Sequence, residues 1–140
     1  IWSMEKIIAL DYGLKRTGIA YAEYPLLIAH SLTTIRSDEL MNYLGKLISQ
    51  NNVVKIVIGE PKSLDGSLTN VTLMVRQLKK KINNIFPKIE VVFYDERFTS
   101  KIAQQTMVLG GMKKSKRRVK ENVDKIAAVV ILQGYLMSNS

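Results

Sequence analysis

The chain of 140 residues is long enough for one domain with a proper core and too short for two. Hydrophobic residues make up 46% of it and charged residues 24%, which excludes a disordered or membrane-embedded chain. There is no cysteine, so disulfides and thiolate metal sites are excluded, and the single His30 argues against a zinc site or a Ser-His-Asp triad. The formal net charge of +9 favours a polyanionic partner, with nucleic acid ahead of a membrane surface.

Nothing in the sequence indicates a membrane or a secretory route. No segment is long and apolar enough to span a membrane, and no signal peptide is visible. We therefore expect a cytoplasmic protein with no membrane partner. Met4 opens the strand-forming sequence, so we expect a single domain over residues 4–138, with residues 1–3 as a remnant of cloning.

The first part of the chain predicts strands that pair antiparallel. Four apolar residues in a row, Ile7 to Leu10, indicate a strand that is buried on both faces and runs straight into Asp11. Gly13 allows the tight turn into a second strand over 18–24, and so short a connection implies antiparallel pairing. A third strand, rich in β-branched residues, is expected over 28–35.

The rest of the chain predicts crossover helices that return it to parallel strands. Ser37 is a good N-cap for a helix that ends at Asn51, and a nearly continuous apolar strand follows over 53–59. This order of elements predicts an α/β domain with a mixed sheet. The remaining expected elements are a loop over 59–70, a helix over 71–85, a strand over 89–94, a short helix over 99–109 and a last helix over about 122–137.

Charge is distributed unevenly around the last helix. This helix is apolar almost all round from Ile126 to Leu132, so we expect it in the interior against a sheet, with Asp124 as the exception in its first turn. Lysine and arginine are concentrated at 79–81 and 113–120. The second run is expected to be a mobile, solvated loop, because it is too charged and too irregular to pack.

Acidic residues from distant parts of the chain are expected to meet at one edge of the sheet. Asp11 and the pair Asp95-Glu96 each follow a predicted strand, and parallel strands share the edge at their carboxyl ends. Asp124 starts a helix that could pack across that edge, although taken alone it is better explained as a partner for the helix dipole. Together the carboxylates indicate Mg²⁺ or Mn²⁺ coordination and an in-line phosphodiester displacement assisted by two ions.

Several motifs, spread over nearly the whole chain, occur in one order. They are Asp11-Tyr12-Gly13-x-Lys15-Arg16-x-Gly18-Ile19-Ala20, Ile58-Gly59-x-Pro61, Asp65-Gly66, Asp95-Glu96-Arg97-x-Thr99-Ser100, and Asp124 followed by Ala127-Ala128-x-x-Ile131-Leu132-Gln133-x-Tyr135-Leu136. Each motif alone is weak, but the set is highly specific. It resembles the YqgF/RuvX family, Holliday-junction-resolvase-like proteins of the ribonuclease H superfamily.

The resemblance implies a ribonuclease H-like fold, with a five-stranded mixed sheet in the order 3-2-1-4-5 and helices on both faces. It also implies a single nuclease domain that depends on Mg²⁺ or Mn²⁺ and matures the 5′ end of pre-16S rRNA. The catalytic and metal-binding acids fall on Asp11, Glu96 and Asp124. Strand alternation lets only one of Asp95 and Glu96 point into the site; we prefer Glu96, with Asp95 as its substitute.

Basic residues near these acids are expected to bind nucleic acid. Lys15, Arg16 and Arg97 would sit where phosphates approach, although a solvated turn charge is an equally good explanation for Lys15. The run before Asp124 is expected to close on the nucleic-acid backbone, with binding that weakens steeply as salt is added. Its residues in this role are Lys113, Lys114, Lys116, Arg117 and Arg118.

Three functions compete at this point. The first is a nuclease on pre-rRNA, with resolution of branched DNA such as Holliday junctions as an alternative. The second is a non-catalytic nucleic-acid-binding factor in transcription or ribosome assembly. The third is a phosphotransferase, since sugar kinases begin with a similar Asp-x-Gly turn. Against it, 140 residues do not supply the second lobe that would enclose a nucleotide, and the sequence has no Walker motif. A ribosomal subunit as partner, and a monomer or a homodimer, are both compatible with the sequence.

Overall fold

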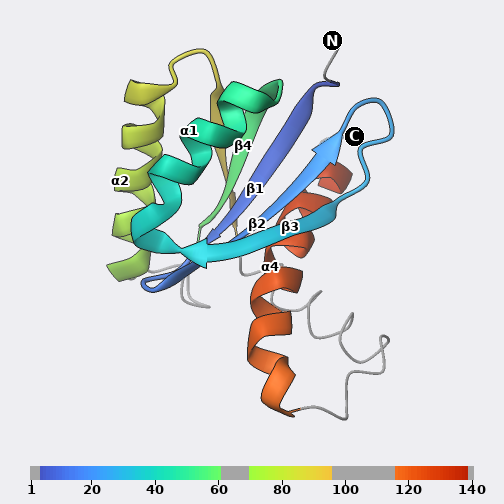
Figure 1. The fold of residues 1–140 in the computed structure, drawn as a ribbon, viewed down its shortest axis with the longest axis vertical. Helices are drawn as coiled ribbons and strands as arrows, with labels where there is room; N and C mark the ends of the chain where they lie inside the picture. The colour runs from blue at the N-terminus through green and yellow to red at the C-terminus, as the bar shows by residue number, and fades with distance from the viewer. Residues whose placement is uncertain (1–3, 61–69, 96–115, 139–140) are drawn as a thin grey trace.

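The computed structural model describes residues 4–60, 70–95 and 116–138, with only the backbone described for 116–125. Its strands form one five-stranded sheet in the order β3-β2-β1-β4-β5, which confirms the predicted ribonuclease H-like arrangement (Figure 1). The elements in chain order are β1 (Lys6–Tyr12), β2 (Arg16–Glu23), β3 (His30–Arg36), the 3₁₀ helix η1 (Ser37–Glu39), α1 (Leu40–Gln50), β4 (Val53–Glu60), α2 (Asn70–Ile85), β5 (Glu90–Asp95) and α4 (Lys116–Ser138).

The central strand β1 joins the two halves of the sheet. It pairs antiparallel with β2 and parallel with β4, while β3 and β5 form the two outer strands. Because β1, β4 and β5 run in the same direction, their last residues, Tyr12, Glu60 and Asp95, lie at one edge of the sheet. We call this the carboxyl edge.

Helices cover both faces of the sheet, as predicted. On one face α1 and α2 pack on a core that includes Ile8 and Leu10 of β1. On the other face α4 packs on small side chains such as Ala9 and Ala20, which let the helix lie close to the strands. The first turns of α4 extend past the carboxyl edge, and the helix then runs back across the sheet (Figure 1).

The expected strand boundaries shift at the end of β4. This strand continues past Gly59 to Glu60, whereas the sequence predicted a strand that ends at Gly59 and a loop from there to residue 70. Pairing with β5 extends the strand, since Gly59 and Glu60 lie opposite Tyr94 and Asp95. Glu60 therefore lies at the carboxyl edge, a position that the loop-like composition of its surroundings did not predict.

The expectation of a loop over 116–120 is wrong, because α4 begins at Lys116 and not near Asn122. Lysine, arginine and glutamate are good helix formers, and no glycine or proline interrupts the helix before Gly134. Residues 1–3, 113–115 and the expected helix over 99–109 lie outside the described residues. No helix in the described part of the chain is long and apolar enough to cross a membrane.

Candidate active site

Asp11 stands at the carboxyl edge, on the face of the sheet that α4 covers. Side chains alternate along β1, and Ile7 and Ala9 pack in the core beneath α4. Asp11 continues this series, whereas Tyr12 packs against the core beneath α1 and α2. A half-buried carboxylate therefore stands where the helix-covered face meets the edge of the sheet.

The turn between β1 and β2 is fixed by hydrogen bonds. The Gly13 amide donates to the Arg16 carbonyl at 2.9 Å, and a Cβ on Gly13 would lie 2.6 Å from that oxygen, so only glycine fits. Ser37 fastens the turn to β3, since its hydroxyl donates to the Gly13 carbonyl at 2.6 Å and its amide to the Lys15 carbonyl at 2.9 Å. Its only hydroxyl proton is thus used, so the buried Thr17 hydroxyl donates to Ser37 Oγ at 2.9 Å.

The prediction of Ser37 as a helix N-cap is wrong. Arg36 occupies the N-cap position of η1, and no side chain there makes a capping hydrogen bond. The Ser37 hydroxyl turns to Gly13 and Thr17 instead, because β3 ends beside the β1–β2 turn. Its role is to hold the turn that carries the exposed Lys15 side chain.

Two arginines lie opposite each other on β2 and β3, the two strands on the antiparallel side of β1. Arg16 of β2 pairs with Arg36 of β3. Both share the face of Asp11, since Gly18, two residues after Arg16, pairs directly with Asp11. Arg36 Nη2 donates to Asp38 at 2.8 Å, and both of these side chains remain exposed. Sequence reasoning missed Arg36, because only the β2–β3 register brings it beside Arg16.

A second group of charges lies at the same edge on the opposite face. Glu60 and Asp95 are cross-strand partners, and each follows by two residues a side chain (Ile58 or Phe93) that packs with the α1–α2 core. The Glu60 side chain is only 9% exposed, and its Oε2 accepts from Arg76 Nε of α2 at 3.2 Å. Sequence reasoning missed both members of this ion pair.

The alternation within β5 places Asp95 on the face away from Asp11. Glu96, Arg97, Lys113 and Lys114 lie outside the described residues. Asp124 belongs to α4, one turn before Ala128 and two turns before Ile131, both of which are buried against the sheet. The predicted binding residues Lys116, Arg117 and Arg118 form the start of this helix.

Among the side chains that the structure describes, no three His, Asp or Glu residues gather into a group that could hold a metal ion. Of the predicted acids, the described side chains are those of Asp11 and Asp95. They lie at one edge but on different faces of the sheet.

Lys55 is held by a polar contact near the start of β4, far from the carboxyl edge. Its Nζ donates to the Tyr135 hydroxyl at 2.6 Å and lies 3.5 Å from Glu90 Oε2. The hydrogen bond to Tyr135 is the main cause of a raised Lys55 pKa; Glu90 adds to the rise and desolvation opposes it. The contact ties the end of α4 to the sheet.

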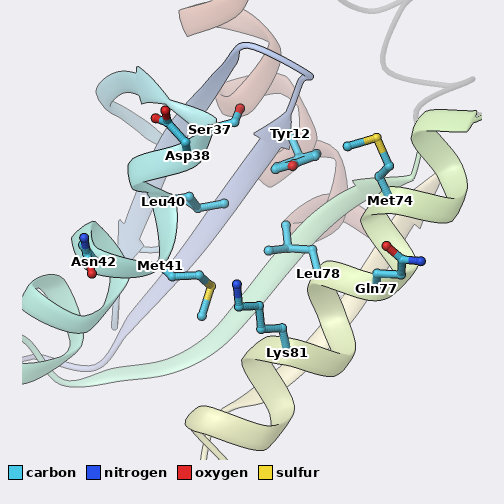
Figure 2. Close-up of a pocket in the computed structure, with 10 residues that line it drawn as sticks. All are labelled: Tyr12, Ser37, Asp38, Leu40, Met41, Asn42, Met74, Gln77, Leu78 and Lys81. Carbon is cyan, nitrogen blue, oxygen red and sulfur yellow. The ribbon is translucent and has the colours of Figure 1, made fainter.

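A hollow of about 510 Å³ lies between α1 and α2, on the face away from Asp11 (Figure 2). Tyr12 and Ser37 line its end nearest the carboxyl edge, and Lys81 of α2 lines the far end beside Met41 of α1. Lys81 therefore lies on the α1 side of α2, whereas Arg76 contacts the strand β4.

The fold is shared with Holliday junction resolvases of known structure. T. thermophilus RuvC in complex with Holliday junction substrate superimposes with a TM-score of 0.55 at 12% identity, over 91% of this chain and 90% of that one. The fowlpox virus Holliday junction resolvase gives a TM-score of 0.55 at 13% identity, over 96% of this chain and 99% of that one. These likenesses define the class of the fold, which is that of the ribonuclease H-like resolvases.

Relatives of higher identity span nearly the whole chain. Proteins named "Putative pre-16S rRNA nuclease" include one from Bacteroides thetaiotaomicron, 44% identical over 96% of this chain and 98% of its own length. Another, from Flavobacterium psychrophilum, is 43% identical over 95% of this chain and 97% of its own length. The family described as "RuvX: Holliday junction resolvase" matches residues 5–138. The chain belongs to this family and is a nuclease that acts on nucleic acid, which confirms the predicted resemblance.

Proposed function

We propose that the protein is a divalent-metal-dependent endonuclease and that its substrate is the 5′ region of pre-16S rRNA. The observation that carries the proposal is the half-buried carboxylate of Asp11 at the carboxyl edge, on one face with Arg16 and Arg36. An acid that shares one face of the sheet with two arginines suits a phosphodiester that must be both held and hydrolysed. The names of the relatives supply the substrate.

The donor chemistry of the chain suits Mg²⁺ or Mn²⁺. Cysteine is absent, and His30, the one histidine, is exposed at the start of β3, so oxygen ligands are the natural set. Asp11, Glu96 and Asp124 would hold the ions. When bound, such ions supply a lowered pKa for the attacking water and neutralise charge at the phosphate.

Two observations favour this choice of acids. Asp95 faces away from Asp11, which leaves Glu96 as the better candidate from that pair. The position of Asp124 precedes by one turn Ala128, which is buried on the same sheet face that carries Asp11. A carboxylate there would cap the covered face at the carboxyl edge.

The basic residues would then hold the substrate without reading its sequence. Arg16 and Arg36 would grip phosphate on the Asp11 side, with the β1–β2 turn kept in place by Ser37. Lys116, Arg117 and Arg118 belong to the part of α4 that extends past the carboxyl edge, and would meet the backbone there (Figure 1). Each contact adds to a binding strength that falls with salt.

A cleavage assay with two substrates tests the proposal. Purified protein is incubated with Mn²⁺ and either a labelled pre-16S 5′ fragment or a four-way DNA junction. We expect the RNA to be cut, and Asp11→Asn to abolish cutting while salt-sensitive binding persists. Glu39→Gln, which changes an exposed acid in η1, is the matched control and should cut as the wild type does. If Asp11→Asn cut the RNA at the wild-type rate, Asp11 would not belong to the active site.

Holliday-junction resolution is the second candidate, favoured by the family description and by the shared resolvase fold. It requires two active sites related by a two-fold axis, hence a homodimer on the junction. Preferential cutting of the junction in the same assay, together with a dimer by light scattering, would establish it. Binding without cleavage of either substrate would favour a non-catalytic factor in transcription or ribosome assembly.

A further inference from the structure

We propose that the side of α2 that faces β5 is a second contact surface for the sugar–phosphate backbone of nucleic acid. This surface, the α2–β5 flank, consists of Arg76 and Lys79, which contact the sheet, and of Lys80, which adjoins Arg76 on the solvent side of the helix. It would continue the substrate path from the carboxyl edge along the outside of the sheet. The inference rests on the proposed function in that the ligand is the nuclease substrate, but it places contacts far from the reacting phosphate.

Arg76 begins the α2–β5 flank at the carboxyl edge. Its Nε donates to the buried carboxylate of Glu60 at 3.2 Å, while 43% of the arginine side chain remains exposed. A guanidinium anchored through one nitrogen loses little further rotamer freedom when it binds a phosphate oxygen. The buried glutamate therefore orients the arginine and leaves it accessible to solvent.

Lys79 is held in a similar way one turn further along. Its Nζ lies 4.9 Å from the ring centroid of Phe93, the residue two positions before Asp95 in β5. This cation–π contact keeps the ammonium over the outer strand of the sheet. Lys80 follows Arg76 by one helical turn and is exposed. The three cations are therefore neighbours on the helix surface: two are fixed by residues of the sheet, and Lys80 lies next to Arg76 on the solvent side.

The direction and spacing of the α2–β5 flank suit a nucleic-acid strand. Arg76 contacts the last residue of β4, and Lys79 lies over a residue further inside the sheet, so the flank leads away from the carboxyl edge. Positions 76 and 80 are about 6 Å apart along the helix axis. Two successive nucleotide steps of one strand rise by about 7 Å, which is a close match.

Charge favours nucleic acid over an acidic protein as the occupant. Of the described residues, the acids that the strands place at the start of the α2–β5 flank are Glu60, which accepts from Arg76, and its cross-strand partner Asp95. Glu90, at the far end of β5, lies 3.5 Å from Lys55. With a net charge of +9 and an active site at the same edge, a continuous polyanion would meet the flank while bound there.

Fluorescence anisotropy with labelled RNA, in EDTA and over a series of salt concentrations, tests the inference. Two probes are used, one just long enough to cover the carboxyl edge and one extended to reach the α2–β5 flank. The flank variants are Lys80→Ala and Lys79→Gln. The controls are Lys81→Ala, from the same helix but beside α1 (Figure 2), and the exposed Lys46→Ala, from α1 itself.

We expect each flank variant to weaken binding of the long probe alone. The slope of log K against log salt concentration should become shallower by about 0.7–0.9 for each lost contact. At about 0.1 M salt this corresponds to a five- to eightfold rise in Kd. The control variants should leave both probes within about twofold of wild type, since charge without contact contributes only through screened, long-range attraction.

Several outcomes would overturn the inference. Equal losses in Lys80→Ala and Lys81→Ala would mean diffuse attraction and no directed path, and no loss in either would mean no contact. Displacement of RNA by poly-glutamate as readily as by unlabelled RNA would point to an acidic protein. Failure here is separable from failure of the proposed function: the binding needs no metal or cleavage, whereas Asp11→Asn tests cleavage alone.

Discussion

Replacing Ser37 by alanine should loosen the turn beside Asp11. The substitution removes the donor to the Gly13 carbonyl and the acceptor of the fully buried Thr17 hydroxyl. A lost hydrogen bond costs about 0.5–1.5 kcal/mol and a buried, unpaired hydroxyl about 1–3 kcal/mol. Water can enter beside the half-buried position 37 and recover part of this, so we expect the free energy of unfolding to fall by about 2 kcal/mol.

Urea unfolding of a double-mutant cycle isolates the contact. Thr17→Val removes the buried donor, so Ser37→Ala should cost about 1 kcal/mol less in that background than in wild type. Ser37→Thr keeps the hydroxyl and should restore part of the stability. Strictly additive effects of the two substitutions, or a loss below about 0.5 kcal/mol for Ser37→Ala, would show that the turn is held by other means.

Further predictions concern the glycines and the contact of α4 with the sheet. Gly13→Ala should reduce the free energy of unfolding by at least about 2 kcal/mol, because its Cβ would lie 2.6 Å from the Arg16 carbonyl. Gly45→Ala, at a helical site with nothing within 4 Å of the new methyl, should instead raise it by about 0.5–1 kcal/mol in the same urea experiment. Tyr135→Phe should bring the pKa of Lys55 down towards its ordinary 10.5, as followed by NMR titration. Because the Lys55 pKa is raised on folding, the protonated lysine stabilises the fold fully at any pH below 10.5, and this contribution is lost as the pH rises through the folded-state pKa. The difference in the free energy of unfolding between wild type and Tyr135→Phe should therefore narrow only at strongly alkaline pH.

The architecture was predictable because its main signals are local. The apolar run from Ile7 to Leu10 is buried on both faces as expected, and the apolar stretch of α4 lies against the sheet. The family resemblance supplied the strand order, which periodicity alone leaves open. The position of Asp11 at a sheet edge follows directly from where its strand ends.

The missed features depend on contacts between distant segments. The ion pair of Glu60 and Arg76 exists only because the crossover brings α2 over the end of β4, and loop-like composition concealed the strand residue. Arg36 gains its place beside Arg16 from strand register. Ser37 carries an N-cap signal, but a neighbouring turn offered its hydroxyl better partners. None of these can be read from spacing along the chain.

Because β1 is buried on both faces, it limits the insertions and deletions that this enzyme can tolerate within the strand. A shift of the strand by a single residue would exchange its apolar side chains between the two cores and turn Asp11 to the opposite face of the sheet. Side-chain volume beneath the helices therefore fixes the face of the sheet on which the Asp11 carboxylate lies. Length changes within β1 should abolish hydrolysis even in variants that still fold.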